Sequence, residues 1–100
     1  MAIYRTARYE VRPGSLAVAA GVVSRFVASV KDNEPGTRTY LALQDKENPS
    51  RFVHLMEFDD AEAEEFHRGT DWVKEFTRGL YPTLEGGISF EELVPVAVDA

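Results

Sequence analysis

The side chains best suited to acid–base chemistry in this sequence are its two histidines, His54 and His67. An imidazole gains and loses a proton near neutral pH, so either ring could serve as a general base or as a hydrogen-bond partner for a substrate. His67 follows the apolar Phe66 and comes shortly before Gly69, where a helical pattern must break. The alternative is a structural histidine that donates to Glu57 or to a backbone carbonyl, and the sequence favours this alternative for His67.

A second pair of candidates is His54 and the single tryptophan, Trp72. His54 lies between Phe52 and Met56 on one face of an expected strand, a position that suits a pocket and a subunit interface equally well. Trp72 could hold a flat aromatic substrate by stacking. A large aromatic side chain at a helix start is more often part of a core or an interface, so this alternative stays open for Trp72.

Three polar side chains complete the candidate substrate-binding set. Tyr40 and Arg38 are expected to share one strand face, where together they could bind a phenolate or a carboxylate by charge-assisted hydrogen bonds. Arg38 could instead be a solvated residue at a strand end. Glu57 would be costly to bury alone, so we expect it to have a partner such as His67 or an arginine.

Metal and cofactor sites find little support in the sequence. The chain has no cysteine, which excludes disulfides, thiol nucleophiles and thiolate metal sites. His54 and His67 with Glu57 form only a weak metal-binding pattern, because their spacing matches no known ligand motif. A glycine-rich phosphate loop is also missing, so we expect no metal and no cofactor.

The charge balance narrows the range of partners. Eleven basic residues stand against seventeen acidic ones, for a net charge of −6, and the basic residues are dispersed. Nucleic acids and anionic membranes bind concentrated basic surfaces, so both are disfavoured as partners. The amino terminus does not resemble a signal peptide, and no apolar run approaches the ~20 residues of a membrane span. A cytoplasmic protein is therefore expected.

The elements that would position these residues follow from hydrophobic periodicity. Loose alternation predicts strands over residues 3–11, 37–44 and 51–58, the last two joined as an antiparallel hairpin. A long helix is predicted after Pro13, with an apolar stripe on one side. That stripe comprises Leu16, Ala19, Ala20, Val23, Phe26, Val27 and Val30.

The second half of the chain predicts a broken helix and a last strand. Asp59 is expected to cap a helix that carries Ala63 and Phe66 inward and breaks at Gly69. Thr70 is expected to cap the continuation from residue 71, whose inward stripe is Val73, Phe76 and Leu80 and which Pro82 ends. A final strand is predicted over residues 88–96, with a bulge or an exposed edge at Glu91 and Glu92.

The resulting order, βαββαβ, predicts an α+β, ferredoxin-like fold: a four-stranded antiparallel sheet with its helices on one face. Its 100 residues are expected to form a single domain. The 51–58 strand is apolar on both faces, and nothing else in the chain is left to cover the second one. We therefore expect a homodimer that forms through the open sheet face.

Short motifs and single residues, each weak evidence alone, follow one another along the chain in the order seen in a known family. They are Pro13-Gly14, Glu34-Pro35-Gly36, Tyr40, Asn48-Pro49, Phe52, Glu57, Ala63, His67, Leu80 and Pro82. Together they resemble the antibiotic-biosynthesis monooxygenase family across nearly the whole chain. The resemblance implies a dimeric α+β barrel with a pocket between each sheet and its helices. Some members oxidise aromatic polyketides with O₂ and no cofactor, and relatives degrade haem or act on quinones.

Two departures refine what the resemblance implies. Trp72 stands where the family often has a second histidine, and the 3–11 strand lacks the asparagine of the haem-degrading branch, which disfavours haem degradation. The hypothesis is a cofactor-independent monooxygenase acting on a small phenol, quinol or polyketide-like aromatic. The alternative is a non-catalytic homodimer of the same fold that binds a small molecule or serves as an accessory protein.

Overall fold

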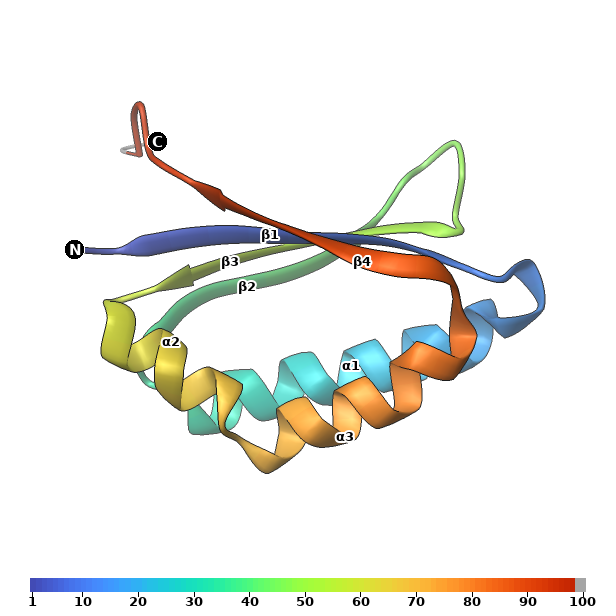
Figure 1. Cartoon of the computed structure of the whole chain (residues 1–100), viewed down its shortest axis with the longest axis horizontal. Coiled ribbons are helices and arrows are strands. Elements are labelled where there is room, and N and C mark those ends of the chain that lie inside the picture. Colours follow the sequence, from blue (N-terminus) through green and yellow to red (C-terminus); the bar gives the residue numbers. More distant parts are fainter. Residues whose placement is uncertain (99–100) are drawn as a thin grey trace.

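The fold, described here for residues 1–98 of a computed structural model, is one antiparallel sheet with helices packed on one face (Figure 1). The strands are β1 (Ile3–Val11), β2 (Thr37–Gln44), β3 (Arg51–Phe58) and β4 (Leu84–Leu93). The helices are α1 (Leu16–Asn33), α2 (Ala61–Arg68) and α3 (Asp71–Leu80), with short 3₁₀ turns at Pro13–Ser15 and Tyr81–Thr83.

The sheet has the strand order β2-β3-β1-β4, and its recorded pairings are all antiparallel. The two edge strands are therefore β2 and β4, and the central strands β3 and β1 come from different halves of the chain. All three helices lie on the same side of the sheet (Figure 1). This arrangement confirms the ferredoxin-like α+β fold predicted from the sequence.

Helix α1 packs an apolar side against the sheet and α3. Its buried side chains are Ala19, Val22, Val23, Phe26 and Val30. The predicted stripe was wrong at one position, because Ala20 is exposed while Val22 is buried. Pro13 stands in the 3₁₀ turn that leads into the helix, where its missing N–H costs no helical hydrogen bond.

The break between α2 and α3 lies where the sequence predicted it. The capping residue of α2 and the buried face of α2 differ from the prediction. Asp60, not Asp59, caps α2 by accepting a hydrogen bond from the backbone N–H of Ala63 at 2.9 Å. Thr70 caps α3 through its side chain, as predicted. Phe66 was predicted to point inward but is 55% exposed. The α2 residues that are buried are Glu64 and His67, so the helix turns a polar side toward the sheet.

Strand β4 begins earlier and ends sooner than the sequence suggested. It runs from Leu84 to Leu93, so Pro95 lies beyond it. The irregularity in its pairing falls opposite Arg8 and Glu10 rather than at Glu91. Gly86 lies in this stretch of β4 with φ of 82°, a backbone conformation that side chains with a Cβ rarely adopt.

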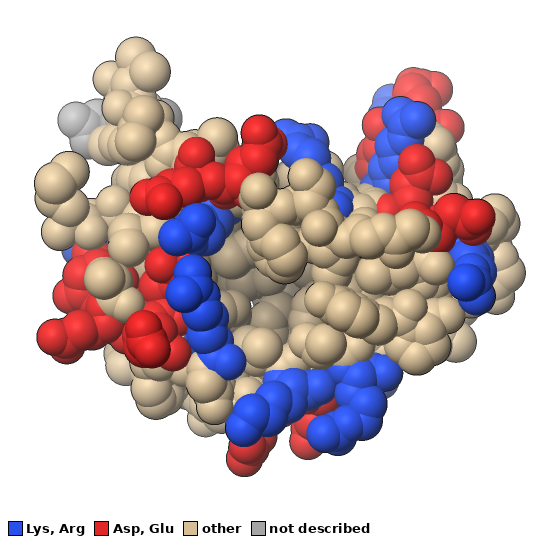
Figure 2. All heavy atoms as spheres, in the orientation of Figure 1, with Lys and Arg blue, Asp and Glu red and all other residues tan. Residues whose placement is uncertain are grey.

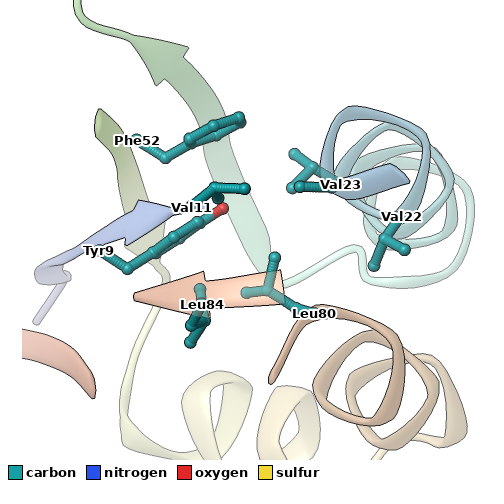
Figure 3. Packing of buried hydrophobic residues seen from close by; sticks show 8 residues of the cluster. Tyr9, Val11, Val22, Val23, Phe52, Leu80 and Leu84 are labelled. Atoms are coloured by element: carbon teal, nitrogen blue, oxygen red, sulfur yellow. The ribbon is translucent and has the colours of Figure 1, made fainter. Parts of the chain in front are cut away.

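The main hydrophobic core lies between the middle of the sheet and helices α1 and α3 (Figure 3). Tyr9 of β1 and Phe52 of β3 stack with ring centroids 5.3 Å apart, as their direct pairing in the sheet allows. Leu80 and Leu84 approach the same cluster from the end of α3 and the start of β4. The core therefore fixes β1, β3 and both long helices relative to one another.

Helix α1 and the turn before it have an unusually apolar composition for their length. Residues 13–33 form a helix that is long and apolar enough to cross a membrane by length and composition alone, whereas the prediction from the sequence of no such run was wrong. Core helices of soluble proteins meet the same criterion, and α1 packs its buried side against the sheet and α3. The length and composition of α1 are therefore weak evidence for a membrane span.

Candidate active site

A cavity of about 340 Å³ lies between the inner face of the sheet and helices α1, α2 and α3. Its walls are mostly aromatic and aliphatic, with contributions from Phe26, Met56, Phe58, Phe76 and Ile88. Figure 2 shows the surface hollowed between sheet and helices, with Lys and Arg side chains beside the hollow. Pockets of this size and character commonly hold small organic ligands.

Strand β3 provides one of the two histidines. The alternation of β3 places Phe52, His54, Met56 and Phe58 on one face, as the sequence predicted, and the structure shows that this is the helix-covered face. His54 is 1% exposed and borders the cavity. His54 therefore lies on the cavity side of the sheet and not on its open face.

Both nitrogens of His54 are engaged by tyrosines. The Tyr9 hydroxyl lies 2.7 Å from Nε2, and the Tyr40 hydroxyl lies 2.8 Å from Nδ1. Burial lowers the pKa of His54 to about 4, so the ring is neutral at pH 7. Burial also raises the pKa of Tyr9 and of Tyr40, so both hydroxyls stay protonated. This triad can orient hydroxyl groups toward a ligand, but His54 has no free nitrogen to act as a base.

Helix α2 provides the second histidine. His67 lines the cavity and packs against the rings of Phe58, Phe26 and Tyr40, with centroids 5.1, 5.8 and 5.9 Å away. Because the ring of Tyr40 also lies 5.5 Å from that of His54, it stands between the two histidines. The fold thus gathers both predicted histidines and one predicted tyrosine around one cavity.

The partner of His67 is Glu34, not the Glu57 suggested by the sequence. Nδ1 of His67 lies 2.8 and 3.0 Å from the two carboxylate oxygens of Glu34. Glu34 is 3% exposed, and it also accepts hydrogen bonds from Trp72 Nε1 at 2.5 Å and from Thr37 Oγ1 at 2.6 Å. Three donors from three different segments therefore surround this buried carboxylate.

Glu57 points to the opposite face of the sheet. There it accepts hydrogen bonds from Tyr4 and Thr39 and forms an ion pair with Arg38 at 3.8 Å. An arginine was one of the two partners expected for Glu57. The structure places neither Glu57 nor Arg38 at the cavity between sheet and helices.

Arg38 and Tyr40 do not share a strand face, because the register of β2 shifts between Thr37 and Thr39. Tyr40 pairs with Met56 on the inner face, whereas Arg38 reaches Glu57 and bonds to Asp59 on the outside. A single irregular residue thus separates two candidates that ideal alternation would bring together.

Trp72 also lies outside the cavity. Its ring makes an edge contact with Phe66, and its indole N–H points to Glu34. Trp72 therefore contacts the site through Glu34 and does not form a wall for a ligand in this cavity.

The rim of the cavity carries a charged cluster. Arg5 donates to both oxygens of Glu64, and Arg68 lies 3.2 Å from the same carboxylate. The hydrogen bond from Arg5 lowers the pKa of Glu64, and Glu64 in turn raises the pKa of Arg5. Arg5, Glu64 and Arg68 all line the cavity, so they border the route by which a ligand would reach the histidines.

Sequence reasoning missed Glu34 and Tyr9 as site residues. Glu34 was named only within the Glu34-Pro35-Gly36 marker, and no local signal indicates a partner for its carboxylate. Tyr9 carried a clearer signal, since it belongs to the inward half of the β1 alternation. Among residues 1–98, no cluster of three or more potential metal ligands is present.

The fold and this cavity define a class of protein, and comparison with known proteins identifies it. A family model described as antibiotic biosynthesis monooxygenase matches residues 2–79. The chain therefore belongs to the antibiotic biosynthesis monooxygenase family. A comparison with curated proteins gives no match.

Solved structures agree with this assignment. A candidate antibiotic biosynthesis monooxygenase from Caulobacter crescentus is 29% identical, with a TM-score of 0.90 over 96% of this chain and 91% of that one. A similarly described protein from Bacteroides thetaiotaomicron is 20% identical, with a TM-score of 0.90 over 96% and 90% of the two chains. A Mycobacterium tuberculosis protein is 16% identical, with a TM-score of 0.90 over 100% of both chains.

Proposed function

We propose that this protein is a cofactor-independent monooxygenase that oxidises a small, electron-rich aromatic substrate such as a phenol, a quinol or a polyketide-like anthrone. The observation that carries the proposal is the placement of His67 and two tyrosine hydroxyls around one aromatic cavity. The cavity volume of about 340 Å³ suits a flat molecule of two or three fused rings.

The proposed reaction needs a base and a dry, apolar site. For an anthrone, His67 would remove a proton from the ring methylene, and the carbanion would pass one electron to O₂. Recombination of the carbon radical with superoxide forms a C–O bond, and the proton held by His67 returns to the peroxide. Loss of water then leaves a carbonyl, so that CH₂ and O₂ become C=O and H₂O.

Other residues would bind and orient the substrate. A tyrosine hydroxyl of the triad formed by Tyr9, His54 and Tyr40 can donate to an anionic substrate oxygen, a bond that strengthens as charge develops. The ring of Phe76 stacks on Phe26 at 4.2 Å and offers a flat surface on the cavity wall. The rim arginines are paired with Glu64, so they add polar groups beside the apolar cavity without a large excess of positive charge.

The proposal includes a homodimer through the open face of the sheet and a cytoplasmic location. Leu41 and Leu43 of β2 are exposed, and they pair in register with Leu55 and Val53 of β3. Those four side chains form an apolar strip on the face that no helix of residues 1–98 covers (Figure 1). A second copy of the sheet would cover it.

Oxygen uptake with a dihydroxyanthrone tests the proposed activity. We expect one O₂ consumed per quinone formed, saturation with substrate, no product under anaerobic conditions, and the same rate after dialysis against a chelator. Turnover no faster than the rate in buffer, across a panel of anthrones and quinols, would contradict the proposal. Saturable binding without turnover would instead support the non-catalytic alternative.

A further inference from the structure

We infer that Glu34 is a positioning residue: its buried carboxylate holds His67 in the tautomer that carries hydrogen on Nδ1, so that Nε2 presents its lone pair to the cavity. This inference rests on the proposed role of His67 as the base. It assigns a role to a residue of the α1–β2 connection that lies thirty-three positions from His67 in sequence.

The direction of the hydrogen bond follows from the chemistry of the pair. An ionised carboxylate can only accept hydrogen bonds, whereas an imidazole nitrogen can donate or accept. Both oxygens of Glu34 lie within 3.0 Å of Nδ1 of His67, so Nδ1 must carry the hydrogen. In a neutral ring the other nitrogen, Nε2, is then the acceptor and the only possible base.

Glu34 is itself held in one place. The carboxylate also accepts from Trp72 and Thr37, and the backbone N–H of Glu34 donates to the carbonyl of Val30 at the end of α1. A buried carboxylate at the carboxyl end of a helix is unfavourable in itself, because it is desolvated and faces the negative end of the helix dipole. The donated hydrogen bonds offset this cost and lock the orientation of His67.

Nε2 of His67 is available to a ligand. Within residues 1–98 no hydrogen bond to Nε2 is recorded, while the ring itself lines the cavity. The nearby carboxylate of Glu64 is engaged by Arg5 and Arg68. His54 differs in this respect, because tyrosines engage both of its nitrogens. We thus assign the role of base to His67 and the role of hydrogen-bond anchor to His54.

The carboxylate has a second consequence for the reaction. When His67 takes a proton at Nε2, the ring becomes a cation, and the adjacent Glu34 stabilises that cation inside a cavity of low polarity. This is the function that a carboxylate performs beside the histidine of a hydrolytic triad. Glu34 acts through His67 and does not touch the substrate.

Nuclear magnetic resonance of ring nitrogens tests the inference without any substrate. In the wild-type protein labelled with nitrogen-15 histidine, we expect His67 in mildly alkaline buffer to be protonated at Nδ1 and unprotonated at Nε2. Protonation at Nε2 in the wild-type protein would overturn the inference, and this outcome needs no variant that has to fold.

The variant Glu34→Gln provides the second arm. Trp72 can only donate, so the amide oxygen should take the place of Oε2, which accepts from the indole N–H, and the amide NH₂ should take the place of Oε1, the oxygen nearer to Nδ1 of His67. We expect the ring to shift to the tautomer protonated at Nε2, and the turnover of a dihydroxyanthrone to fall by roughly 10²–10⁴ with little change in KM.

Glu57→Gln is the matched control, because it makes the same chemical change on the outer face of the sheet. It should leave the tautomer of His67 unchanged. If Glu34→Gln folds and also leaves the tautomer unchanged, Glu34 is only structural and the inference fails. If the tautomer shifts as expected but the wild-type protein has no oxygenase activity, the inference about His67 holds and the proposed function fails.

Discussion

The hydroxyl of Tyr9 on β1 lies 2.7 Å from Nε2 of His54 on β3, and this buried contact links the two central strands of the sheet on the cavity side. A neutral imidazole has one N–H group, so one of its two tyrosine partners donates to the ring and the other accepts from it. The accepting tyrosine keeps its own O–H hydrogen free for a ligand. The choice of tautomer at His54 therefore decides whether Tyr9 or Tyr40 donates into the cavity.

Removing both tyrosine hydroxyls should cost more stability than the sum of the single removals. In Tyr9→Phe or Tyr40→Phe, the His54 N–H can still bond to the remaining hydroxyl, so each variant should lose about 1–2 kcal/mol. In the double variant the buried N–H has no partner, and we expect an extra loss on the order of 1 kcal/mol. Urea unfolding of all four proteins measures this coupling.

Tyr81→Phe is the control for the loss of a hydroxyl, since Tyr81 is exposed and should change stability by less than about 0.5 kcal/mol. Strict additivity of the two buried variants would mean that the hydroxyls do not share His54.

The stability of the protein should fall as the pH drops from about 6.5 to about 4. The pKa of His54 is about 4 in the folded protein against an ordinary value of 6.5, because burial disfavours the charged ring. Between these values the unfolded chain binds more protons than the folded one, so acid favours unfolding. The loss attributable to His54 should approach about 3 kcal/mol at the lower end of this window.

Urea midpoints measured across this pH range test the prediction. His54→Gln should be less stable at pH 7 but should show a flatter profile, because it has no imidazole at this position. Equal slopes for the variant and the wild-type protein would show that His54 does not titrate as proposed.

Gly36 should not tolerate a side chain. A Cβ at this position would lie 2.6 Å from Cβ of Ala63, where the α1–β2 connection passes close to α2. Gly36→Ala should therefore cost about 1–3 kcal/mol through overpacking. Gly87→Ala is the control, because nothing lies within 4 Å of the added methyl group.

A second substitution tests whether the contact with Ala63 causes the loss of stability in Gly36→Ala. Adding Ala63→Gly to Gly36→Ala removes the clash and should recover part of the loss, although a helical glycine costs about 1 kcal/mol by itself. Thermal unfolding of the single and double variants measures the recovery. A double variant that is less stable than Gly36→Ala would show that the contact with Ala63 is not the cause.

The proposed dimer should depend on the open sheet face. Leu41→Lys places a charge on the apolar strip, and sedimentation at micromolar concentration should then give a monomer where the wild-type chain gives a dimer. Val18→Lys makes the same change at an exposed position of α1 and should leave the dimer intact. A monomeric wild-type chain would contradict the proposed association.

Much of the fold could be predicted from the sequence because local patterns and the global fold agree. Strict alternation in β3 assigned His54 to one face and Leu55 to the other, and Thr70 after Gly69 marked the helix restart. The predicted faces of side chains were wrong where a single residue shifted the pairing register of a strand. The β2 irregularity at Arg38 is an example, because no local signal distinguishes it from an ideal strand.

The candidate site was harder to predict than the fold. His67 was recognised by its chemistry, but its partner depends on how α2 packs against the end of α1, which only tertiary structure determines. Phe66 illustrates the same limit: apolar character predicted an inward position, while the polar Glu64 and His67 face the cavity instead. Polar residues at a ligand cavity reverse the usual rule that apolar side chains face inward.

The most direct test of the proposed chemistry is a comparison of turnover and thermal stability in His67→Asn. The asparagine amide can still donate to Glu34 from near the position of Nδ1, so the buried carboxylate keeps its partner while the base is lost. We predict that kcat for a dihydroxyanthrone falls by about 10²–10⁴, whereas the lost ring contacts lower the thermal midpoint but leave the variant folded at the assay temperature. A variant that retains its turnover, or loses it only in proportion to the unfolded fraction, would contradict the assignment of His67 as the base.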